Sequence, residues 1–88
     1  MTAKLGKPVI LLAFRHLGSD YRLVWIPKQR GSDAHGVVEV RYVDALGEAA
    51  WRNVQNLYPP RGDLDRDDTS LQRVILHKLI DRVRRGRA

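Results

Sequence analysis

The sequence predicts an α+β protein, a three-stranded antiparallel β-meander followed by two α-helices that pack on one face of the sheet. Three observations support this fold class. Residues 9–14 form an uninterrupted apolar run, residues 37–43 alternate between apolar and polar side chains, and residues 71–83 carry apolar side chains at helical spacing. The 88 residues are expected to form one small basic domain, with residues 1–7 and 86–88 frayed.

The first strand is expected at residues 9–14, with the sequence VILLAF. An apolar run this short is typical of a strand that is buried on both faces of a sheet. It is too short to cross a membrane, which takes roughly 20 apolar residues. The lysines before it resemble the start of a signal peptide, but Arg15 and His16 stand where a cleavage site needs small residues, so the strand interpretation is preferred.

A second strand is expected at residues 21–26, which are rich in β-branched and aromatic side chains. The short connection at residues 17–20 predicts that the first two strands form a hairpin. Pro27 ends the second strand because proline cannot donate to a β-ladder. Residues 28–36 contain two glycines and show no periodicity, which predicts an exposed loop suited to contacts with a partner.

The third strand is expected at residues 37–43, where the alternation places two sets of side chains on opposite faces. Val38, Val40 and Tyr42 share one face, and Glu39 and Arg41 share the other. This pattern predicts a strand with one buried and one exposed face.

Residues 44–58 decide the architecture, and their periodicity favours a helix. At about 100° per residue, six apolar side chains fall within one arc. They are Leu46, Ala50, Trp51, Val54, Leu57 and Tyr58. Asp44 is a suitable N-cap, and Pro59 and Pro60 would end the helix. Gly47 disfavours a helix by about 1 kcal/mol. If the segment is a strand instead, the alternative fold is a small SH3-like β-barrel with a C-terminal helix.

A final amphipathic helix is expected from a cap at Thr69 or Ser70 to about Arg85, after a polar connector at residues 61–68. Its apolar half consists of Leu71, Ile75, Leu76, Leu79, Ile80 and Val83. Aspartates precede its amino end and arginines lie at its carboxyl end, as the helix dipole favours. Gly86 closes it.

The charge distribution predicts a polyanionic partner. The net charge is +6, and residues 71–88 carry six basic and one acidic side chain, or +5. We therefore expect a non-enzymatic nucleic-acid-binding accessory protein of a bacterium or phage, which contacts DNA or RNA phosphates through the last helix and the loop at residues 28–36. The candidate binding residues are Lys28, Arg30, Arg41, Arg73, Lys78, Arg82, Arg84 and Arg85.

Aromatic side chains on the sheet are a further candidate, because bases can stack on them. Trp25 and Tyr42 are the side chains best placed for this, given the neighbouring basic residues. In a domain this small, however, Trp25 and Trp51 are both expected in the core.

The alternative function is that of a protein-interaction adaptor or a homodimer. The apolar half of the last helix is broader than three strands can easily cover. Leu76 and Ile80, at one edge of that half, would then line the interface.

Other chemistries find little support in the sequence. Asp63, Asp65 and Asp67 alternate as in a calcium-binding EF-hand loop, but Asp68 stands where that loop needs glycine and Val74 where it needs glutamate. No metal-ligand spacing, catalytic triad, phosphate-binding glycine loop or cofactor fingerprint is present. The absence of cysteine excludes disulfides and favours the cytoplasm. The sequence thus predicts no enzyme activity, no cofactor, no metal and no membrane partner.

Overall fold

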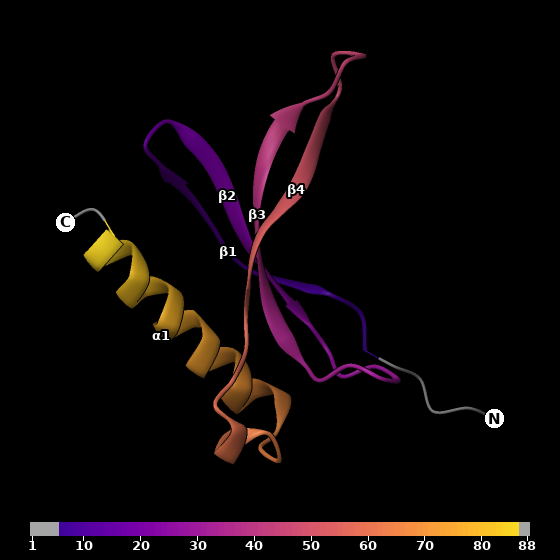
Figure 1. The fold of residues 1–88 in the computed structure, drawn as a ribbon, viewed down its shortest axis with the longest axis vertical. Helices are drawn as coiled ribbons and strands as arrows, with labels where there is room; N and C mark the ends of the chain where they lie inside the picture. Colours follow the sequence, from indigo (N-terminus) through magenta and orange to yellow (C-terminus); the bar gives the residue numbers. More distant parts are fainter. Residues whose placement is uncertain (1–5, 87–88) are drawn as a thin grey trace.

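The computed structural model describes residues 6–86, so most of the expected fraying at residues 1–7 and 86–88 lies outside the described residues. Within these residues, four antiparallel strands form one open sheet in the order β1-β2-β3-β4, and a single long helix crosses one face of it (Figure 1). The elements are β1 (Val9–His16), β2 (Ser19–Ile26), β3 (His35–Val43), β4 (Ala49–Leu57), a short 3-10 helix η1 (Arg61–Asp63) and α1 (Asp68–Gly86).

The α+β class is confirmed, but the details of three strands and two helices are wrong. Residues 49–57 form β4 rather than a helix, and the sheet stays open at β1 and β4 rather than closing into an SH3-like barrel. No helix within residues 6–86 is long and apolar enough to cross a membrane.

A β-bulge explains why β4 has the spacing of a helix. Val38 pairs with Gln55 but the next residue, Glu39, pairs with Asn53, so Val54 is an extra residue in β4. An extra residue moves the following side chains to the other face of the sheet. The large apolar side chains before, at and after the bulge are therefore three residues apart, at Trp51, Val54 and Leu57.

The two hairpin turns follow from residues with positive φ. Leu17 and Gly18 have φ of 51° and 84°, the signature of a two-residue type I′ turn, and they confirm the predicted β1–β2 hairpin. In the second hairpin the Asp44 carboxylate accepts hydrogen bonds from the Leu46 and Glu48 N–H groups at 2.9 and 3.0 Å. Asp44 thus caps a turn, in which Gly47 has φ of 82°, and not a helix.

The core lies between α1 and one face of the sheet. Leu71, Ile75 and Leu79, one turn apart on α1, are buried against the sheet. The sheet contributes Leu23, Trp25, Val38 and Leu57 to the same cluster. Trp25 is fully buried, as predicted, whereas Trp51 is only half-buried and lies on the opposite face.

Gly36 allows the close approach of α1 to the sheet. A Cβ atom at this position would lie 2.6 Å from Cγ2 of Ile75 and 3.2 Å from Cδ1 of Leu23. Real Cβ contacts are longer than the first of these, so only glycine leaves room for Ile75 here. Position 36 therefore fixes where α1 lies on β3.

Asp67 caps α1, where the sequence predicted Thr69 or Ser70. Its carboxylate accepts a hydrogen bond from the Ser70 N–H at 2.8 Å, and its carbonyl accepts one from the Leu71 N–H at 3.1 Å. The hydrogen bond from the Ser70 backbone, with one from the Ser70 side chain and the positive charges of Arg66 and Arg73, lowers the pKa of the Asp67 carboxyl below its ordinary value.

The position of β1 differs most from expectation. The sequence predicts a strand buried on both faces, but β1 forms an edge of the sheet, and Val9 and Ile10 are 45% and 57% exposed. One long side of this apolar strand has no neighbouring strand within the described residues 6–86.

Candidate nucleic-acid interface

The outward side of α1 carries the largest group of basic side chains on one element. The buried row on the other side holds the helix against the sheet, so this side faces solvent. Its exposed basic or titratable side chains are Arg73, His77, Lys78, Arg84 and Arg85, and its acidic one is Asp81. Within residues 6–86, Arg73, Lys78 and Arg85 form no ion pair with a carboxylate.

Two of the predicted binding residues, Lys78 and Arg82, also form hydrogen bonds that link α1 to β4 and to Tyr58 directly after it. The Lys78 ammonium donates a hydrogen bond to the Tyr58 carbonyl at 3.2 Å. When the Gln55 amide is oriented with its oxygen toward Arg82, that oxygen accepts hydrogen bonds from Nη1 and Nη2, both at 3.0 Å. Lys78 and Arg82 therefore form the flank of α1 nearest β4, and their charges are held in fixed places.

An open depression lies on the amino-terminal half of the same side of α1. It has a volume of about 490 Å³ and is lined by Arg66, Ser70, Arg73, Val74 and His77. Arg66 was not among the binding residues predicted from the sequence, because it lies in the connector before the helix. Its Nε atom is 3.7 Å from Asp63, and this link holds the guanidinium beside α1.

The loop at residues 28–36 is a separate basic site. Lys28 and Arg30 are exposed in a tight turn, where the backbones of Gln29 and Ser32 exchange two hydrogen bonds of 3.0 Å. The part of this segment from His35 onward belongs to β3. Figure 1 shows the turn and the carboxyl end of α1 on opposite sides of the molecule, which measures 41 × 36 × 17 Å.

Arg41 lies on the sheet face opposite α1, away from the other candidates. There it is the cross-strand neighbour of Trp51. The Arg22 guanidinium lies 4.1 Å from the Trp51 ring centroid and forms a half-buried ion pair of 2.7 Å with Glu39. Arg22 and Trp51 therefore stabilise this face together, and Arg41 does not join the basic side of α1.

Aromatic side chains are divided between the two faces. Trp25 is buried in the core, as expected, and is therefore not available to stack on a base. Tyr42 is 41% exposed and has the Arg52 guanidinium 5.6 Å from its ring centroid. The rings of His35 and Tyr58, which the sequence analysis had not selected, stack at 5.1 Å.

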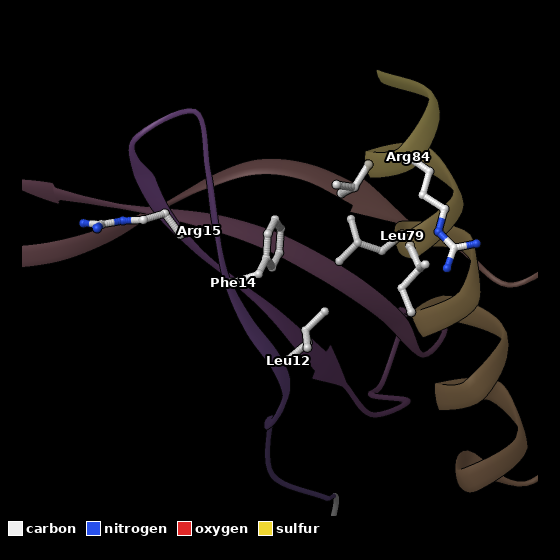
Figure 2. A pocket seen from close by; sticks show the side chains of 7 residues that line it. Leu12, Phe14, Arg15, Leu79 and Arg84 are labelled. Carbon is white, nitrogen blue, oxygen red and sulfur yellow. The ribbon is translucent and has the colours of Figure 1, made fainter. Parts of the chain in front are cut away.

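Leu76 and Ile80 lie on the flank of α1 that points toward β1. Both are half-buried. Ile80 lines an apolar groove of about 280 Å³ between α1 and β1, with Leu12, Phe14, Leu79 and Val83. Figure 2 shows Leu12 and Phe14 directed toward Leu79 across this groove, with Arg15 pointing away and Arg84 on the outer side of the helix.

No protein-family model, curated protein or solved structure matches this chain. Within residues 6–86 no group of three or more histidine, aspartate or glutamate side chains is placed to hold a metal ion. The fold and the placement of charge are therefore the features that bear on function.

Proposed function

We propose that this is a non-enzymatic nucleic-acid-binding protein that contacts the phosphate backbone through the outward side of α1. The observation that carries the proposal is the group of exposed basic side chains on a helix whose opposite side is fixed in the core. Because the backbone of α1 is already fixed against the sheet, binding has to order only the side chains. At 1.5 Å per residue, the 19 residues of α1 span about 28 Å, enough to follow several phosphates.

The residue types determine the kind of recognition expected. Arginine forms bidentate hydrogen bonds with phosphate oxygens and keeps its charge at any physiological pH. Contacts of this kind position a protein on nucleic acid without identifying its sequence. We therefore expect weak sequence specificity, with Arg73, Arg84 and Arg85 as the main phosphate contacts and Lys28 and Arg30 as a secondary site.

The first test is binding of labelled duplex and single-stranded DNA and RNA over a series of salt concentrations. The variant Arg84→Glu with Arg85→Glu should lower affinity at low salt by a factor of ten or more. Its plot of log affinity against log salt should be shallower by about two units on a duplex, since each lost phosphate contact removes about 0.9.

The matched control is Lys28→Glu with Arg30→Glu, which changes the net charge by the same amount at the other side of the molecule. It should weaken binding less than the α1 variant. Equal losses in the two variants would mean that overall charge, and not the α1 surface, drives binding. If the wild type binds nothing at the lowest salt concentration, the proposed function is wrong.

A further inference from the structure

The two edges of the sheet differ in character. β4 carries Arg52, Asn53 and Asn56 along its exposed edge, and charged and polar residues there discourage pairing with another strand. Both edge strands contain a bulge, at Val54 in β4 and at Leu11 in β1, so the bulge does not distinguish them. β1 has no charged residue from Val9 to Phe14. An apolar strand of this kind is typical of the interior of a sheet, where both of its sides are paired and both of its faces are covered.

The hairpin geometry turns backbone groups of β1 toward its open side. A two-residue type I′ hairpin closes on a hydrogen-bonded pair, here His16 and Ser19. Antiparallel pairs alternate between hydrogen-bonded and non-hydrogen-bonded. By this alternation the N–H and C=O groups of Ala13 and Arg15 face away from β2, so they are available to another strand.

We propose that two copies of this chain pair antiparallel through β1, about a two-fold axis at Ala13, and form one continuous eight-stranded sheet. In this register each Leu12 lies opposite the partner's Phe14 on the face that carries α1. Both helices then lie on the same side of the joined sheet. The proposal goes beyond nucleic-acid binding and does not depend on it.

The groove beside β1 supports a second copy as the occupant. Its lining is mainly apolar and continues onto Ile80 and Val83 of α1, with Arg15 and Arg84 as its charged members. Leu76 is half-buried on the same flank. A two-fold axis at Ala13 brings this flank toward the same flank of the partner. Arg15 falls outside the central pairs formed by residues 12–14, because it lies opposite the partner's Leu11, the bulged residue of β1, and not another charged residue. The β1 edge is uncharged from Val9 to Phe14 and apolar on both faces of the strand, so the strand that matches it best is β1 of a second copy.

The available area is sufficient for a stable but modest dimer. About an axis at Ala13 the two β1 strands overlap over residues 10–16, and seven residues at about 3.4 Å each give an edge of about 24 Å. A sheet with one helical layer is roughly 20 Å thick. The contact then covers roughly 500 Å² of each copy, or about 1,000 Å² in total, which is the lower limit for a specific interface. A dissociation constant of the order of 10 µM is expected.

The test is sedimentation equilibrium of the full chain without nucleic acid, over a range of concentrations on both sides of the expected dissociation constant. Ala13→Pro removes the outward N–H without removing a bond to β2, so it should yield a monomer. Ala49→Pro places the same substitution at an exposed position on the opposite edge and should remain a dimer. Circular dichroism and thermal melting show whether each variant is folded.

Ile80→Lys keeps the proposal falsifiable if Ala13→Pro fails to fold. It places a charge on the half-buried α1 flank and should give a folded monomer. A wild type that is monomeric at concentrations far above the expected dissociation constant would overturn the proposal. In that case a strand from another protein would be the remaining partner for the β1 edge. A folded Ala13→Pro or Ile80→Lys variant that remains a dimer would overturn it as well.

Discussion

Asp67 shows how one carboxylate sets the start of α1. Its hydrogen bond with the Ser70 N–H lowers its pKa in the folded state, so its contribution to stability is complete above the unfolded pKa, near 3.8, and is lost as pH falls through the lower folded pKa. Asp67→Ala should lower the melting temperature at neutral pH, and this difference from wild type should shrink as pH falls from about 3.8 through that lower folded pKa. Asp67→Asn, which keeps an acceptor oxygen, should lie between the two. A difference that stays constant with pH would contradict this role.

Single residues also explain why the capping predictions failed. Asp44 and Asp67 both precede a segment whose apolar residues have helical spacing, and both accept hydrogen bonds from N–H groups that follow them. The same local chemistry serves a β-turn in one case and a helix in the other. The sequence could identify these aspartates as local caps, but only the pairing of β3 with β4 shows that Asp44 begins a turn and not a helix.

At the level of elements, Gly36 and Ile75 control how α1 packs on β3. Gly36→Ala should destabilise the fold by about 1–3 kcal/mol, because the new Cβ overlaps Cγ2 of Ile75. Ile75→Ala alone should cost about 2–5 kcal/mol through the cavity it leaves. The double variant should lose less than the sum, since each change relieves the other.

Urea unfolding followed by circular dichroism measures these free energies. Gly62→Ala is the matched control, because nothing lies within 4 Å of a Cβ at that position, and it should change stability little. Additive losses in the Gly36 and Ile75 variants would show that the two positions do not share one contact.

The elements that the sequence predicted well are those in which one pattern continues without interruption. β2 ends before Pro27 as expected, and α1 keeps its buried row through three turns to Leu79. β4 was missed because the bulge at Val54 changes the face of its side chains midway, so no single period describes it. Whether a bulge forms depends on how β4 pairs with β3, and the sequence of β4 alone does not show this pairing.

For the whole molecule, the two proposed surfaces should act together. In the β1-paired dimer both helices lie on one side of the sheet, so a duplex long enough to reach both should release counterions at two basic surfaces. Ala13→Pro should then reduce the salt dependence of binding to as little as half that of the wild type. Measurement on the same long duplex tests this. An unchanged salt dependence would mean that the two basic surfaces never engage one duplex together.

At this scale the sequence predicted the character of the candidate site better than its layout. It identified the basic side of α1. It also grouped Arg41 with that side, although Arg41 lies on the other face of the sheet. It grouped Lys28 and Arg30 with it as well, although their turn lies on the other side of the molecule. It likewise predicted that residues 9–14 are covered on both faces, whereas β1 is an edge strand in the single chain. The charge and apolarity of a segment can be read from its sequence, whereas the topology of the sheet determines which segments lie side by side.

The order of elements along the chain has a consequence for biosynthesis. The four strands precede α1, so the sheet face with Leu23, Trp25 and Leu57 is translated before the helix that covers it. At about 5–20 residues per second, the 19 residues of α1 take on the order of 1–4 s to synthesise. Until α1 has been made, no described segment covers that face, so a product that ends before Asp68 would expose an apolar surface and be prone to aggregation.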